Sequence, residues 1–262
     1  MKGVGKMKKY ISELIGTFTL VFIGSGTYVL AGNMVGQLGV ALAYALALIG
    51  VYSAFGRVSG AHINPAVTLG ALVSKRISVL DSIYYIVAQL AGAVLGSIAV
   101  YLIAIGKPEY ELSFGLGQNG IGANTLGAYS LSAAIIFELI ATFLFVYIFL
   151  SATSSYLKNV KCNRTRHNAG IGIGLFFGAA YIMGLQVSGA SLNPARSFGP
   201  AFLVGFVEKT AWTDLWVFIL FPVIGGLLAG LVYNLLHKTT DDEIIDEIDE
   251  IEEIEVIEII EE

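Results

Sequence analysis

Two short polar segments in an otherwise apolar chain hold the residue types that could act on a small molecule. Ser59-Gly60-Ala61-His62-Ile63-Asn64-Pro65-Ala66 is nearly repeated as Ser188-Gly189-Ala190-Ser191-Leu192-Asn193-Pro194-Ala195, with Asn193 129 positions after Asn64. Asparagine before proline is a helix-start signal, because the side chain caps the first turn and proline fits the first helical position. Two such starts inside a membrane bundle would place amide donors and positive helix ends on a pore.

The composition predicts the elements that position these segments. Only 13% of the residues are charged, against about 25% in soluble domains, and the mean hydropathy is +0.76. Six apolar runs reach the length of about 20 residues that a helix needs to cross a bilayer. They cover roughly residues 10–31, 38–56, 83–105, 131–153, 169–187 and 215–237. We therefore expect an all-α membrane protein with six transmembrane helices.

The chain is an internal duplication. Glu13-Leu14-Ile15-Gly16-Thr17-Phe18 in the first run resembles Glu138-Leu139-Ile140-Ala141-Thr142-Phe143 in the fourth. Each half has three spans, an odd number, so the halves enter from opposite faces as an inverted three-plus-three repeat. Each Asn-Pro-Ala precedes only about ten residues before the next polar break, which predicts two half-helices. We expect a channel domain at residues 1–238, with repeats at about 8–106 and 130–238.

The net charge of −5 combines two opposite parts. The segment 241–262 has 13 of the 20 acidic residues and no basic one, so the remainder has 15 basic residues against 7 acidic ones. The basic residues gather at the N-terminus and in the second and fourth connections, and the positive-inside rule then places both termini in the cytoplasm. Residues 239–262 form a low-complexity acidic tail, which we expect to be a disordered or frayed helical appendage in the cytoplasm.

The paired Asn-Pro-Ala segments, the matching glutamates and the inverted halves together resemble the aquaporin family, the major intrinsic proteins, over about residues 8–238. The resemblance implies a passive channel in the plasma membrane, not an enzyme, that assembles as a homotetramer with one pore per subunit. It implies water and small neutral solutes as permeants, lipid as the surroundings, and no cofactor, metal ion or nucleic acid.

The two asparagines suggest how such a pore would exclude protons. A water molecule between Asn64 and Asn193 would accept from both side-chain amides, so its hydrogens would point outward and interrupt a proton wire. The half-helix dipoles add roughly half an elementary charge at each N-terminus, which repels cations. Stepwise acceptors for water are predicted at the carbonyls of Gly60, Ala61, His62, Gly189, Ala190 and Ser191.

Arg196 follows the second Asn-Pro-Ala. A buried arginine costs about 2.5–3.5 kcal/mol on membrane-insertion scales, so it should face water or a partner. The resemblance implies a selectivity constriction formed by Arg196, Tyr44, Tyr181 and Ala190. Tyr181 rests on an ungapped count, so Ile182 or Ala180 could replace it. The chain departs here from the family's common water filter, which has Phe and His where Tyr44 and Tyr181 stand, and it lacks the Trp usual in glycerol facilitators.

Three further residues are candidates for pore lining or loop support. Glu13 and Glu138 are ionisable groups deep in spans, which is a functional signal, and the resemblance implies that they accept hydrogen bonds from the half-helix loops. His62 either braces its loop or lines the pore. Ser197 stands where glycerol facilitators typically have Asp, which favours water as the permeant.

Other functions remain as alternatives. A channel for glycerol or another small neutral solute is the nearest, because the filter lacks its histidine. A secondary transporter is less consistent with the sequence, since no span pairs carboxylates with substrate-binding bases. An intramembrane enzyme lacks support, because neither a His-Glu-x-x-His zinc motif nor a Gly-x-Ser-x-Gly elbow occurs.

Overall fold

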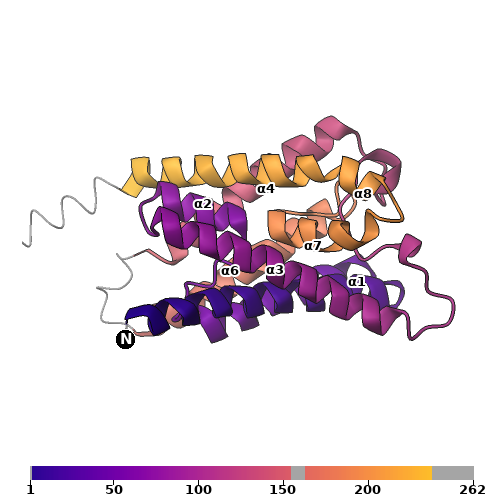
Figure 1. The fold of residues 1–262 in the computed structure, drawn as a ribbon. Helices are drawn as coiled ribbons and strands as arrows, with labels where there is room; N and C mark the ends of the chain where they lie inside the picture. Colours follow the sequence, from indigo (N-terminus) through magenta and orange to yellow (C-terminus); the bar gives the residue numbers. More distant parts are fainter. Residues whose placement is uncertain (1, 155–162, 238–262) are drawn as a thin grey trace, which may run out of the picture.

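The computed structural model describes residues 2–154 and 163–237, and within them all regular structure is helical (Figure 1). The helices are α1 (Lys2–Phe55), α2 (Pro65–Val73), α3 (Val79–Ala104), α4 (Leu131–Ala152), α6 (Asn163–Gly184), α7 (Pro194–Val204), α8 (Thr210–Thr213) and a final helix at residues 215–237. Two short 3-10 helices, η1 (Leu112–Phe114) and η2 (Gly122–Asn124), lie between α3 and α4. The predicted acidic tail lies outside the described residues.

The long helix α1 is a hairpin of two antiparallel spans. Gly36 interrupts it with φ 64° and ψ −174°, a left-handed φ that glycine adopts without steric cost. Beyond this break the chain returns along itself, so the ring of Tyr44 packs on Gly24 and its hydroxyl lies 2.8 Å from the hydroxyl of Ser25. One helical element therefore supplies the first two spans that the sequence predicts.

With α1 counted as two, the described chain has six transmembrane helices, which confirms the predicted number. The stretches long and apolar enough to cross a membrane are Gly5–Phe55, Val79–Ala104, Leu131–Ala152 and Thr210–His237. The apolar part of α6, Ala169–Gly184, is shorter. The sequence predicts that this fifth span ends at residue 187, which is three residues too late. The chain turns at Gly184, whose carbonyl accepts from Val187 N and Ser188 N at 3.0 and 3.1 Å.

The half-helices α2 and α7 lie inside the bundle, between the longer helices, and contact each other (Figure 1). They have nine and eleven residues. At 1.5 Å per residue this is about 14 and 17 Å, roughly half of the 30 Å hydrocarbon thickness. Neither helix can span the bilayer alone, so their starts meet within it.

Glycines allow the helices to pack with their backbones close together. A Cβ atom at Gly92 of α3 would lie 2.2 Å from the carbonyl oxygen of Leu14 in α1. A Cβ atom at Gly226 of the final helix would lie 2.4 Å from the carbonyl oxygen of Ala66 in α2. Close packing through small residues is the usual mode of association between membrane helices.

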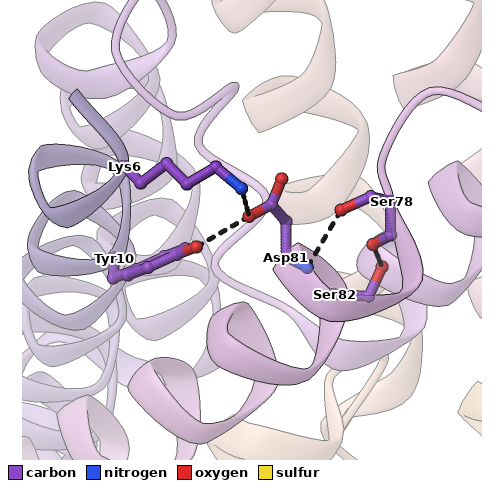
Figure 2. A network of polar contacts seen from close by, with 5 residues as sticks. All are labelled: Lys6, Tyr10, Ser78, Asp81 and Ser82. Carbon is purple, nitrogen blue, oxygen red and sulfur yellow. Dashed lines mark hydrogen bonds and ion pairs between the residues drawn. The ribbon is translucent and has the colours of Figure 1, made fainter. Parts of the chain in front are cut away.

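A polar network ties the start of α1 to the start of α3 (Figure 2). The hydroxyl of Tyr10 donates to Asp81 Oδ1 at 2.7 Å, and Lys6 Nζ lies 3.5 Å from the same oxygen. Ser78 caps α3 by accepting from Asp81 N at 3.1 Å, and Ser82 Oγ donates to the Ser78 carbonyl at 2.9 Å. Lys6 is largely exposed, so its ion pair contributes little, and the Tyr10 hydrogen bond is the firmer link.

We expect Gly226→Ala to destabilise the fold by about 1–3 kcal/mol, the usual cost of overpacking, because the added methyl group would meet the backbone of Ala66. Gly172→Ala in α6 is the matched control, since nothing lies within 4 Å of a Cβ atom there. Thermal unfolding in detergent measures the difference. Equal unfolding midpoints for the two variants would contradict this account of the packing.

Candidate functional site

Asn64 and Asn193 cap the two half-helices where these meet. Asn64 Oδ1 accepts from Ala66 N at 2.8 Å, and Asn193 Oδ1 accepts from Ala195 N at 3.0 Å and Arg196 N at 3.3 Å. Proline follows each asparagine at the start of the helix. The side-chain oxygens therefore serve the helix ends, and the side-chain N–H groups point to other partners.

Each cap also bonds to the opposite repeat. Asn64 Nδ2 donates to the carbonyl of Leu192 at 2.8 Å, and Asn193 Nδ2 donates to the carbonyl of Ile63 at 2.9 Å. A carboxamide has two N–H donors, and one donor of each asparagine is committed to this crossed pair. One N–H of each asparagine therefore holds the two half-helices together, a contact that the sequence did not indicate.

Two buried carboxylates hold the loops that precede the half-helices. Glu13 in α1 accepts from His62 N at 3.0 Å and Ile63 N at 2.6 Å. Glu138 in α4 accepts from Ser191 N at 2.8 Å and Leu192 N at 2.9 Å. An unpaired amide in the apolar interior would cost several kcal/mol, so each carboxylate satisfies two donors that no helix can satisfy.

The same two loops store backbone strain in matching places. Ala61, Ile63, Ala190 and Leu192 all have φ between 42° and 53°. Such left-handed values cost of order 1–3 kcal/mol each for non-glycine residues and gather at functional sites. The glycines before them, Gly60 and Gly189, have φ 91° and 78°, and serine hydroxyls complete the turns, since Ser59 Oγ accepts from Ala61 N and Ser188 Oγ from Ala190 N.

His62 lies against the first half-helix. Its Nδ1 is 3.3 Å from Thr68 Oγ1, and its ring packs edge-on against Tyr85 and Phe149, with centroids 5.2 and 5.8 Å away. Of the two roles considered for His62, these contacts favour bracing of the loop. Ser191, the matching residue of the second repeat, instead donates to the Asn193 carbonyl at 3.2 Å and bonds to the Ser197 hydroxyl.

Arg196 is buried with its guanidinium group held from three sides. It is 2% exposed. Its Nε donates to the Tyr181 hydroxyl at 2.9 Å, Nη2 donates to the Gly189 carbonyl at 3.4 Å, and Nη1 donates to Asn119 Oδ1. A buried charge is tolerated only where it is hydrogen-bonded in this way.

The two tyrosines lie beside this guanidinium group. The ring centroids of Tyr44 and Tyr181 are 4.2 Å apart. Arg196 Cζ lies 5.2 Å from the first ring and 5.8 Å from the second, within the range of a cation–π contact. Both tyrosines are fully buried, and Ala190 belongs to the same buried cluster. Ile182 is half exposed, so Tyr181 is the residue of this stretch that reaches Arg196.

A cavity of about 280 Å³ adjoins Arg196 on the side of the connection between α3 and α4. Gln118, Asn124 and Thr125 of that connection line it, together with Tyr28 of α1 and Gly189. The guanidinium group of Arg196 therefore has free space on this side.

Sequence reasoning missed two polar residues of this site. Asn119 lies 77 positions from Arg196, in a connection whose composition shows only that it is a loop. Gln89 in α3 donates to Glu13 at 2.8 Å and to Thr68 at 2.9 Å. A buried amide in an apolar span is itself a functional signal, so Gln89 could have been found from the sequence, whereas Asn119 could not.

Comparisons with known proteins agree with this architecture. The family model described as "Major intrinsic protein" matches residues 1–233. Aquaporin Z of Rhodopseudomonas palustris is 36% identical over 234 residues, covering 87% of this chain and 92% of that protein. Aquaporin Z of Bradyrhizobium diazoefficiens is 37% identical over 239 residues, covering 88% and 94%. The glycerol uptake facilitator protein-like 6 of Lactiplantibacillus plantarum is 39% identical over 224 residues, covering 86% and 95%.

Solved structures show the same fold. The X-ray structure of the aquaglyceroporin from Plasmodium falciparum superimposes with a TM-score of 0.75 and 24% identity, covering 87% of this chain and 96% of that one. The family match extends over nearly all of the described residues, and it includes both Asn-Pro-Ala segments and Arg196. The chain belongs to the major intrinsic protein family of membrane channels.

Proposed function

We propose that this channel conducts water passively and excludes protons and ions. The observation that carries the proposal is the crossed pair of asparagine caps, Asn64 and Asn193, together with the buried Arg196 that follows the second cap. Hydrogen-bond donors in fixed positions suit passive flow. They can bind a permeant without any part of the protein having to open alternately to the two sides of the membrane. Two of the relatives described above are named aquaporin Z.

Proton exclusion follows from the donors at the meeting point of the half-helices. One N–H of each asparagine is committed to the opposite repeat, and the other is the donor that we assign to a passing water molecule. A water oxygen that accepts from both Asn64 and Asn193 directs its hydrogens along the path, away from the centre. The positive ends of α2 and α7 add an electrostatic barrier to hydronium and other cations.

The constriction at Tyr44, Tyr181, Ala190 and Arg196 favours water over larger solutes. The tyrosine rings are in contact and the guanidinium group lies over them, so little width remains for a carbon chain. Ser197 is neutral and bonds within the protein. Both features support a narrow filter that passes small molecules. Most hydrogen-bond donors of this filter bind other groups of the protein.

A facilitator of glycerol or another small neutral solute is the second candidate. It is favoured by the 39% identity to the glycerol uptake facilitator-like protein and by the absence of a histidine from the four predicted filter positions. Water and glycerol permeability therefore have to be measured in the same vesicles.

The setting proposed for the channel follows the charges of the sequence. The basic connections favour an orientation with both termini in the cytoplasm, and we propose the plasma membrane as the location of the channel. Four copies would assemble with one pore each, and residues 1–238 would form the channel domain, followed by the acidic tail.

Proteoliposomes should shrink rapidly in a sucrose gradient, while a pH-sensitive dye inside them reports no more proton entry than in protein-free vesicles. The cause is the asparagine pair, which interrupts the hydrogen-bonded wire. Stopped-flow light scattering and dye fluorescence measure the two fluxes. A proton flux that rises in proportion to the water flux would contradict the mechanism.

Tyr44→Ala and Tyr181→Ala should each raise glycerol permeability roughly tenfold, the effect of lowering a barrier by about 1.4 kcal/mol. Each substitution removes one ring from the constriction. Tyr84→Ala is the control, because Tyr84 is 47% exposed on the outside of α3. If neither filter variant changes the glycerol rate, the two tyrosines do not form the constriction.

Arg196→Val should increase glycerol and urea permeability and admit cations, since it removes both bulk and fixed positive charge. Arg196→Lys keeps the charge but loses the planar donors, so it should admit larger neutral solutes and still exclude cations. Solute-gradient light scattering and ion-flux assays separate these outcomes. Wild-type permeability in a correctly folded Arg196→Val variant would place Arg196 outside the pore.

A further inference from the structure

The connection between α3 and α4 folds back onto the loop that precedes the second half-helix. Gly120 N donates to the Ser188 carbonyl at 3.4 Å, and Gly127 N donates to the Gln186 carbonyl at 3.0 Å. Asn119 is 5% exposed, although it belongs to a connection on the surface of the bundle. A buried carboxamide at this place requires partners for both of its ends.

The side chain of Asn119 joins three groups of the second repeat. Its Oδ1 accepts from Arg196 Nη1 and, at 2.7 Å, from Ser197 Oγ. Its Nδ2 donates to the Ser188 carbonyl at 3.0 Å. The orientation of this amide is fixed by chemistry, because a guanidinium group has only donors and a carbonyl only accepts.

We infer that Asn119 is a positioning residue of the constriction, which sets solute selectivity by holding the Arg196 guanidinium group against the two tyrosines. This inference rests on the proposed function, in which Arg196 borders the pore. Without Asn119, Arg196 keeps the Tyr181 hydrogen bond and the longer one to Gly189. The adjoining cavity of about 280 Å³ then offers the guanidinium group a place to move away from the rings.

Ser197 takes part in the same arrangement. It follows Arg196 in α7, and its hydroxyl bonds to Asn119 Oδ1 and to the Ser191 hydroxyl. Ser197 therefore binds the connection between the repeats through Asn119. The width of the filter depends on a segment that lies outside the transmembrane helices, so selectivity can change without any change in the spans.

The test compares glycerol and water permeability of four proteins in proteoliposomes: wild type, Asn119→Ala, Asn119→Asp and Ser113→Ala. Asn119→Ala should raise the glycerol-to-water ratio about tenfold, which corresponds to about 1.4 kcal/mol. Asn119→Asp keeps an acceptor for Arg196, with a charge-assisted bond, and should restore most of the wild-type ratio. Ser113→Ala is the control, since Ser113 lies in the same connection but is exposed and bonds to Glu111 at 3.2 Å, and it should leave the ratio unchanged.

A double-variant cycle with Arg196→Val shows whether Asn119 acts through Arg196. In the Arg196→Val background, Asn119→Ala should add nothing to the ratio. Two outcomes would overturn the positioning role and leave the proposed constriction intact. In the first, the two substitutions change the glycerol-to-water ratio independently, so that their effects multiply in the double variant. In the second, Asn119→Ala has the wild-type ratio although Arg196→Val has a raised one. A wild-type glycerol-to-water ratio in Arg196→Val would overturn both the positioning role and the proposed constriction. Should Asn119→Ala fail to assemble, Asn119→Leu takes its place, because leucine is close to asparagine in size but offers Arg196 no acceptor, and an unaltered glycerol-to-water ratio in that variant would overturn the role.

Discussion

A polypeptide can leave its helical hydrogen bonding in the middle of an apolar bundle only where other groups accept from its backbone amides. Glu13 and Glu138 meet this requirement, each for two consecutive amides. The strained loops, the short helices α2 and α7 and the meeting of their N-termini all depend on these four hydrogen bonds. The carboxylates lie at equivalent places in the two repeats, so the buried amides of both loops are satisfied in the same way.

The two repeats differ in the residues that surround their half-helix loops. In the first, Gln89 supports the carboxylate and His62 packs between aromatic rings. In the second, Ser191 stands in place of His62 and bonds within its own loop, and Arg196 brings a charge where the first repeat has Val67. The charge is held by a tyrosine, a carbonyl and the connection between the repeats. The residues that the repeats share thus build the central meeting point, and the residues in which they differ build the proposed constriction, which belongs to the second repeat only.

The sequence predicts those parts of the structure that local chemistry decides. Asparagine before proline locates the starts of α2 and α7, and apolar run length locates the six spans. Contacts that depend on three-dimensional folding could not be predicted in the same way. Asn119 reaches Arg196 only because its connection turns inward, and one N–H of each asparagine cap is used by a carbonyl of the other repeat. The end of α6 was misplaced because apolar residues continue past the turn at Gly184.

The crossed hydrogen bonds between the caps affect how the protein is made. The ribosome completes the first repeat while the acceptor for Asn64 and the donor to Ile63 are still to be synthesised; 130 positions separate Ile63 from Asn193. At about 5–20 residues per second, this delay is about 6–26 s. During that time Glu13 can hold the loop before the first half-helix, but Asn64 and Ile63 lack their partners in the second repeat. The nascent first half is therefore an incomplete unit, and the pore matures only after the last three spans have inserted.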